Sequence, residues 1–178
     1  MSGGDAVTLD LLFARARTGQ LPLEAVINSA EQLQHAHRPA DAAALYRLWL
    51  EHTSSPAACV AHFNLGVLLA AAGDLDGAQQ HYHEAWALNP RLHQARINAG
   101  LIAERQRKPA EAAQLWLDVA AAAAGAPDTL QFATIALNHL GRMEESRRQY
   151  AAAEAALAKS LQLNPQQPDA IQHWVHLR

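Results

Sequence analysis

The sequence has few aromatic residues, a single cysteine and no long apolar run, and each of these scarcities excludes a class of protein. Aromatic residues make up 6% of the chain, and Cys59 has no second cysteine for an intrachain disulfide. No apolar stretch approaches the roughly 20 residues that a membrane-spanning helix requires. The N-terminal residues lack both the basic and the apolar segment of a secretory signal. These features predict a cytoplasmic protein in a reducing compartment, with no membrane partner.

The overall charge and composition narrow the fold and the partners. A formal net charge of −3 gives no electrostatic reason to expect nucleic acid or an anionic membrane as a partner. Half of the residues, 50%, are hydrophobic, and alanine dominates long stretches. Alanine favours helix and occupies little volume, so it suits helices that approach closely. Because no segment shows a sustained strand-like alternation, the composition predicts an all-α fold.

One pattern of residues recurs along the chain with a period of about 34 residues. Each copy has a small residue in its first helix, a small residue opening its second helix, and a large residue four positions later. The first set is Ala30, Gly66, Gly100 and Gly141; the second is Ala42, Ala78, Ala112 and Ala153; the third is Tyr46, Tyr82, Trp116 and Leu157. We expect the two small residues to meet at a close helix crossing and the large residue to fill the space between repeats. The tripeptide Leu-Asn-Pro at Pro90 and at Pro165 predicts the end of a second helix, because proline cannot donate the next hydrogen bond.

This pattern resembles the tetratricopeptide-repeat (TPR) family, whose signature is W-x2-L-G-x2-Y, then A-x3-F, then P. The resemblance implies an α-α solenoid, a right-handed superhelix of antiparallel helix pairs whose first helices line a concave groove. The expected organisation is a capping helix within 1–22, which carries an amphipathic segment at 8–17, followed by TPR units at 23–56, 59–92, 93–126 and 127–167. The fourth unit should have a first helix extended over 128–146, and 168–178 is either a capping helix or the start of a truncated fifth unit.

The expected groove carries a row of asparagines at one repeat position, Asn28, Asn64 and Asn98, and His139 and His173 take the same position in the later repeats. An asparagine amide can donate and accept, so such a row can pair with the backbone of an extended peptide. The alternative is that these asparagines serve only local packing.

Neighbouring groove positions indicate the character of the ligand. The early groove is expected to be apolar through Ile27, Phe63, Ile97, Val67 and Leu101, and the later groove more polar through residues such as Arg142. The lysines and arginines with which some TPR proteins clamp a terminal carboxylate are missing at these positions in the first three repeats. An extended peptide with a few apolar side chains is therefore the expected ligand.

The sequence contains no convincing catalytic or metal-binding motif. The close histidine pairs His35/His37 and His81/His83 are two residues apart and point to nearly opposite sides of a helix. His173 and His176 could share a face but have no evident third ligand. Cys59 has no evident base partner. We therefore expect no catalytic residue, no metal and no cofactor in this chain.

Two features together resemble the N-terminal TPR region of bacterial SPINDLY-type proteins, relatives of the O-linked N-acetylglucosamine transferases. They are the asparagine row, Asn28, Asn64 and Asn98, and the terminal stretch LNPQQPDAIQHWVHLR. The resemblance implies a substrate-recruiting arm of a protein glycosyltransferase, although His139 and His173 depart from the row. Two alternatives stay open. One is a stand-alone adaptor; the other is a homodimer formed through the convex surface, with Trp49, Trp86 and Trp116 as candidate contacts.

Overall fold

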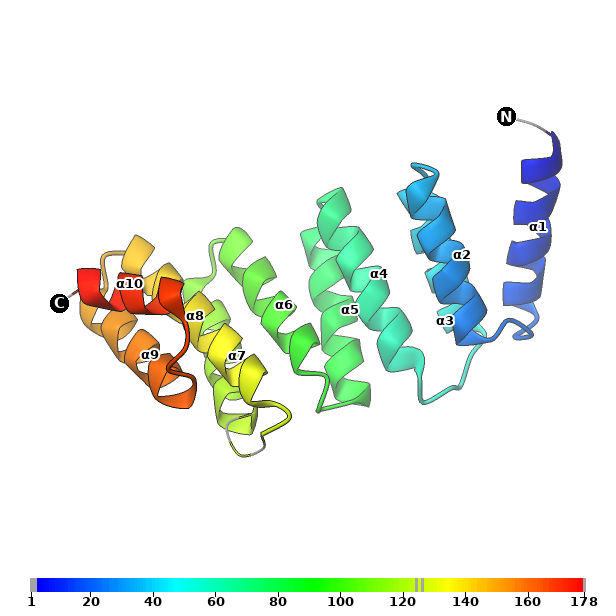
Figure 1. Cartoon of the computed structure of the whole chain (residues 1–178). Helices are drawn as coiled ribbons and strands as arrows, with labels where there is room; N and C mark the ends of the chain where they lie inside the picture. The colour runs from blue at the N-terminus through cyan, green and yellow to red at the C-terminus, as the bar shows by residue number, and fades with distance from the viewer. Residues whose placement is uncertain (1–2, 124, 126, 178) are drawn as a thin grey trace. The chain divides into compact units, whose positions relative to one another are not determined.

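In the computed structural model, the described residues 3–123, 125 and 127–177 form ten α helices and no strand, with side chains described from residue 9 on. The predicted all-α fold is thereby confirmed. The chain divides into two compact units, residues 1–90 and 91–178. Each unit is a run of antiparallel helices joined by short turns (Figure 1). None of these helices is long and apolar enough to span a membrane.

Unit 1 holds the first five helices. They are α1 (Gly3–Arg17), α2 (Leu23–His35), α3 (Pro39–Glu51), α4 (Ala58–Ala72) and α5 (Leu75–Leu88). Helix α1 packs against α3, α2 packs on α3, α3 on α4, and α4 on α5. Ala16 of α1 is fully buried. The Trp49 indole Nε1 of α3 donates a hydrogen bond of 2.7 Å to the carbonyl of Leu21, which ties the linker between α1 and α2 to the first repeat.

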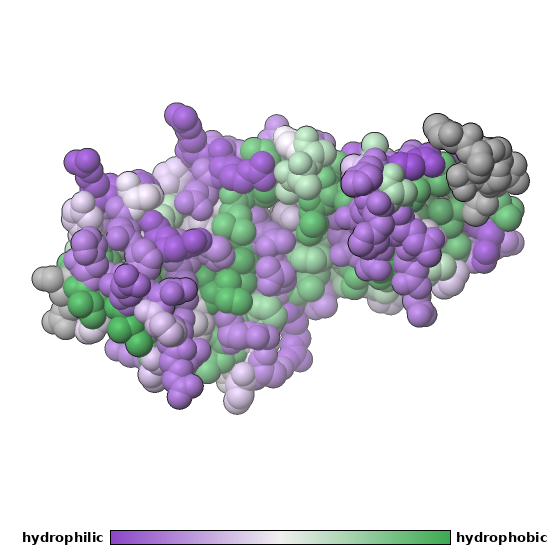
Figure 2. All heavy atoms as spheres, turned by 45° about the horizontal axis from the view of Figure 1, so that its top comes forward, coloured by the Kyte–Doolittle hydropathy of each residue, from purple (hydrophilic) through white to green (hydrophobic). Residues whose placement is uncertain are grey.

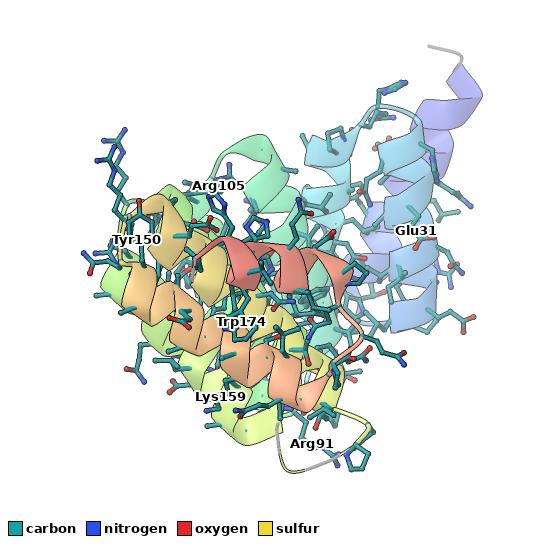
Figure 3. All side chains as sticks on the ribbon, turned by 60° about the vertical axis from the view of Figure 1, so that its left-hand side comes forward. Glu31, Arg91, Arg105, Tyr150, Lys159 and Trp174 are labelled. Atoms are coloured by element: carbon teal, nitrogen blue, oxygen red, sulfur yellow. The ribbon has the colours of Figure 1, made fainter. Side chains whose placement is uncertain are left out.

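Unit 2 holds the remaining helices. They are α6 (His93–Arg105), α7 (Pro109–Ala123), α8 (Leu130–Ser146), α9 (Tyr150–Leu163) and α10 (Pro168–His176). Each helix packs on the next, and α6 also contacts α8. Helix α8 ends at Ser146 as expected and begins at Leu130, two residues after the predicted start. Helix α10 begins at Pro168, and the labelled Trp174 lies between it and α9 (Figure 3).

The helix ends follow from the residues at them. Proline occupies the first position of α3, α7 and α10, where a missing N–H costs nothing. The Asp74 carboxylate caps α5 by accepting from the Gly77 N–H at 3.0 Å. Helices α5 and α9 end at Leu88 and Leu163, which confirms the predicted Leu-Asn-Pro stops.

Each turn between paired helices contains one residue in the left-handed backbone conformation. In the four successive pairs these residues are His37 (φ 58°), Gly73 (φ 87°), Arg107 (φ 60°) and Arg148 (φ 61°). In each case the next N–H bonds back to a carbonyl five residues earlier, as in a Schellman helix end. Glycine is the residue that adopts this conformation without steric cost, yet it fills only one of these four positions.

The small residue of each first helix faces the large residue of its own second helix. An added Cβ would lie 2.8 Å from Tyr82 Cε1 at Gly66, 2.7 Å from Trp116 Cε2 at Gly100, and 2.7 Å from Leu157 Cγ at Gly141. The close crossing inferred from the sequence is confirmed. At Gly141 the opening alanine Ala153 lies at the same crossing, since its carbonyl oxygen is 3.6 Å from the added Cβ, and all four opening alanines are fully buried.

Candidate peptide-binding surface

The large residue of a second helix also reaches forward to the next repeat. In unit 1 the Asn64 amide Nδ2 on α4 donates to the Tyr46 hydroxyl on α3 at 3.0 Å. In unit 2 the His139 ring on α8 stacks on Trp116 of α7, with centroids 5.4 Å apart and planes 21° apart. Asn64 and His139 occupy the same repeat position. That position therefore joins consecutive repeats in both units.

The three asparagines of the predicted row differ in their bonding. Asn28 on α2 is exposed, and none of the described residues gives it a side-chain hydrogen bond. The amide of Asn64 is half-buried and partly used by Tyr46. On α6, the Asn98 carbonyl oxygen accepts from Gln94 Nε2 at 3.0 Å. Since Asn28 and Asn64 belong to unit 1 and Asn98 to unit 2, a continuous row of all three stays a prediction.

The apolar positions of the expected groove are partly accessible. Ile27 on α2 and Phe63 on α4 are half-buried, and the Phe63 ring lies 5.9 Å from that of Tyr82. Val67, one turn further along α4, is 42% exposed. Leu101 of α6 is half-buried and packs against the core of unit 2.

Ile97 is a core residue, so its assignment to the groove is corrected. Its side chain is 1% exposed within the hydrophobic cluster of unit 2. Its carbonyl accepts a 3.2 Å hydrogen bond from Trp116 Nε1, so this face of α6 is turned toward α7. The repeat spacing predicted that Ile97 and Asn98 both face the groove. The rotation of α6 instead buries the Ile97 side chain and leaves that of Asn98 half-buried.

A hollow of about 380 Å³ lies in unit 2 between α8, α9 and α10. Its lining residues are Ile135, Asn138, His139, Arg142, Leu157, Asp169, Ala170, Gln172 and His173. The predicted groove residues His139 and Arg142 therefore face one hollow. Sequence reasoning missed Asp169 and Gln172, because their place depends on how α10 lies against α8.

Hydrogen bonds hold the polar wall of the hollow in position. Arg142 Nη2 lies 2.7 Å from His139 Nδ1, and because a guanidinium carries only donors, Nδ1 accepts and the ring proton sits on Nε2. Burial, and next the charge of Arg142, lower the pKa of His139 and so favour the neutral form of the ring. His173 of α10 and Glu145 of α8 approach to 3.0 Å between Nδ1 and Oε2.

The segment before α10 is anchored by Gln167. Its Nε2 donates to the carbonyl of Asn164 at 2.6 Å and to that of Ser160 at 3.1 Å. Its Oε1 accepts from Asn138 Nδ2 of α8 at 2.7 Å. These bonds fix the start of α10, and with it Asp169, relative to α8.

The chemistry of this hollow suits recognition of a peptide. Arg142 and the His139 Nε2–H present donors, Asp169 adds an exposed carboxylate, and Ile135 is an apolar side chain that is 38% exposed. Such a surface can bind peptide carbonyls or a carboxylate together with one apolar side chain. Figure 2 shows hydrophobic and hydrophilic side chains alternating over the visible face of unit 2.

Other candidate residues lie away from such chemistry. In the part of the chain that the structure describes, no three His, Cys, Asp or Glu side chains are placed to hold a metal ion. Cys59 is a free thiol, 7% exposed. The proposal of tryptophan contacts on the convex surface is corrected for Trp49 and Trp116, which are 4% and 0% exposed. Trp86 is half-buried against the ring of His83.

No protein-family model matches the chain, and no curated protein matches its sequence. Solved structures do resemble it. MamA is 16% identical over 88% of this chain and 84% of its own, with a TM-score of 0.67. PilF of Pseudomonas aeruginosa is 24% identical over 93% of this chain and 68% of its own, with a TM-score of 0.65.

A tetratricopeptide-repeat protein from Parabacteroides merdae gives a TM-score of 0.72 at 17% identity, over 86% of this chain and 58% of its own. These likenesses establish the fold as that of a TPR solenoid. None of these three proteins is described as a glycosyltransferase, so they lend no support to the narrower SPINDLY-type resemblance.

Proposed function

We propose that this chain is a protein–protein interaction scaffold that binds an extended peptide segment against its first helices. The hollow between α8 and α10 carries the proposal, because Arg142, His139 and Asp169 are held there beside an exposed isoleucine. Unit 1 adds the exposed Asn28 amide and the apolar side chain of Val67. Binding rather than catalysis accounts for these side chains, and no cofactor enters the proposal.

Peptides selected from a random display library against the full chain test the hollow. Arg142→Ala removes one charged donor and frees His139 Nδ1, so we expect the Kd of a selected peptide to rise about 5–50-fold. The matched control is Lys159→Ala, an exposed residue on the side of α9 turned away from α10 (Figure 3). Calorimetric titration should separate the two variants. Equal affinities for Arg142→Ala and the wild type would remove the hollow from the binding site.

The asparagine row is tested most cleanly at Asn28. Its amide makes no side-chain hydrogen bond to the described residues, so Asn28→Ala changes what a ligand meets without breaking a contact of the fold. Asn64→Ala would also cut the bond to Tyr46 and confound binding with stability. If Asn28→Ala leaves the affinity of every selected peptide unchanged, the row has no role in unit 1.

The more specific form of this proposal is the substrate-recruiting arm of a SPINDLY-type protein glycosyltransferase acting in the cytoplasm. Its support is the residue pattern alone, Asn28, Asn64 and Asn98 at one repeat position. An immunoblot of the source cells should then show a polypeptide much larger than 19.3 kDa, which labels proteins in a nucleotide-sugar-dependent manner. A band near this mass with no such labelling would leave a stand-alone adaptor.

Homo-oligomerisation through the convex surface is the remaining alternative. Of its three tryptophans only Trp86 is accessible, since Trp49 and Trp116 are buried. Light scattering over a concentration series would support it only if the mass rises above that of one chain.

A further inference from the structure

Two turns of unit 2 hold an arginine in a conformation that suits glycine. Arg107, between α6 and α7, has φ 60°, and Arg148, between α8 and α9, has φ 61°. In the same kind of turn between α4 and α5 the residue is Gly73, with φ 87°. A left-handed conformation is sterically unfavourable for a residue with a side chain. Backbone strain of this kind, repeated at two equivalent turns, is typical of functional sites.

Neither arginine serves the packing of the helices. Both are exposed, and neither makes a side-chain hydrogen bond or ion pair with another described residue. By contrast, the neighbouring Arg147 is held by both oxygens of Glu144, at 3.1 and 3.0 Å. The charges of Arg107 and Arg148 are therefore left for a partner outside the chain.

The two turns form a basic edge of unit 2, which consists of Arg105, Arg107, Lys108, Arg147 and Arg148. Five of the 14 Lys and Arg residues of the chain lie in these two short segments. Figure 1 shows both turns at the same edge of unit 2, and Figure 3 labels Arg105 and Tyr150 there, one beside each turn. The same turns of unit 1 are different: Arg38 is paired with Asp41 at 2.6 Å, and two acidic residues, Asp74 and Asp76, follow Gly73.

A hollow adjoins the basic edge at the second turn. It measures about 460 Å³ and is lined by Glu145, Ser146, Arg148, Tyr150, His176 and Leu177. Tyr150, which is 53% exposed, lines this hollow together with Arg148. An aromatic ring and an arginine at the rim of a concave surface can hold one side chain of a bound segment.

We propose that the basic edge binds an acidic peptide segment of another protein, with one side chain seated in the hollow beside Tyr150. Charge complementarity selects the partner, because carboxylates match the guanidinium groups of Arg107 and Arg148 bidentately. The small extent of the site, two turns, suits a short peptide. This site is separate from the hollow between α8 and α10.

The test exploits the conflict between stability and binding at the two arginines. The double variant Arg107→Gly/Arg148→Gly relieves the backbone and removes both charges. With a fluorescein-labelled hexaglutamate peptide as probe, we expect the Kd from anisotropy to rise about tenfold or more at low salt. The melting temperature should stay equal to that of the wild type or increase. Arg107→Lys/Arg148→Lys should keep most of the affinity.

His37→Gly is the matched control, since it makes the same backbone change in a turn of unit 1 that is not part of the basic edge. Its affinity for hexaglutamate should equal that of the wild type. Hexaglutamate binding that the double glycine variant retains, or that the wild type lacks, would overturn the proposal. So would a clearly lower melting temperature of the double variant, since the arginines would then be kept for stability. Tighter binding to phosphatidylserine vesicles or to oligothymidine than to hexaglutamate would also overturn it.

Discussion

Replacing Gly100 by alanine is the sharpest test of how the helices of a repeat are held together. An alanine Cβ there would lie 2.7 Å from Trp116 Cε2 and 2.8 Å from Cδ1. The indole is fully buried and bonded through Nε1 to the carbonyl of Ile97 at 3.2 Å, so it has no room to retreat. The side chain must shift, or α6 and α7 must separate.

Three effects set the change in the free energy of unfolding, two of them destabilising and one stabilising. Overpacking of a core costs about 1–3 kcal/mol. Loss of the indole hydrogen bond adds about 1 kcal/mol, and the helix propensity of alanine returns about 1 kcal/mol. Gly100→Ala should therefore lower the free energy of unfolding by roughly 1–3 kcal/mol, or the melting temperature by about 2–10 °C. Urea and thermal melts followed by far-UV circular dichroism measure both.

The first repeat supplies the control for this prediction. There Ala30 takes the glycine position, with Tyr46 as its large partner, and both are buried. Gly66→Ala, opposite Tyr82, should consequently cost less than Gly100→Ala. Adding Trp116→Tyr to Gly100→Ala should restore part of the loss, with a favourable coupling energy in a double-mutant cycle. A Gly100→Ala protein as stable as the wild type would refute the close packing of this crossing.

Two further perturbations concern pH and a helix cap. Burial lowers the pKa of four histidines below the ordinary value of 6.5: His62, His81, His93 and His139. As the pH falls through 6.5, these histidines bind protons in the unfolded chain before they do so in the folded chain. The free energy of unfolding is therefore highest above about pH 7 and decreases on acidification. The urea midpoint should be lower at about pH 5.5 than at about pH 7.5, and His62→Gln/His81→Gln should reduce the difference; equal midpoints would contradict this reasoning. Asp74→Ala should destabilise unit 1 by about 0.5–2 kcal/mol through loss of the α5 cap, while Asp74→Asn should keep most of it, and equal melts of the two variants would argue against the cap.

The helix pairs follow from the sequence because their determinants are local. Gly66 and Tyr82, or Gly100 and Trp116, lie within one repeat, so their spacing alone implies the crossing. The helix stops before Pro90 and Pro165 follow from the chemistry of proline.

The missed features depend on rotations and on contacts between repeats. Ile97 and Asn98 are adjacent in sequence, and only the rotation of α6 decides that the first is buried. Asp169 reaches the hollow because Gln167 bonds to Asn138, 29 residues away, and no repeat signature encodes that bond. The left-handed arginines carry no sequence signal either, since turns of this kind accept glycine more readily.

The contact between Tyr46 and Asn64 has a mechanical consequence. In a solenoid each repeat is stabilised mainly by its nearest neighbours, so the atoms that join two repeats set the stiffness of that junction. A ligand whose backbone carbonyl accepts a hydrogen bond from Asn64 Nδ2 competes with the Tyr46 hydroxyl for the two N–H groups of that amide. The junction becomes more flexible if the ligand replaces the Asn64–Tyr46 hydrogen bond, and stiffer if the amide bonds to both. The bending between the first two repeats would then report whether a ligand is bound.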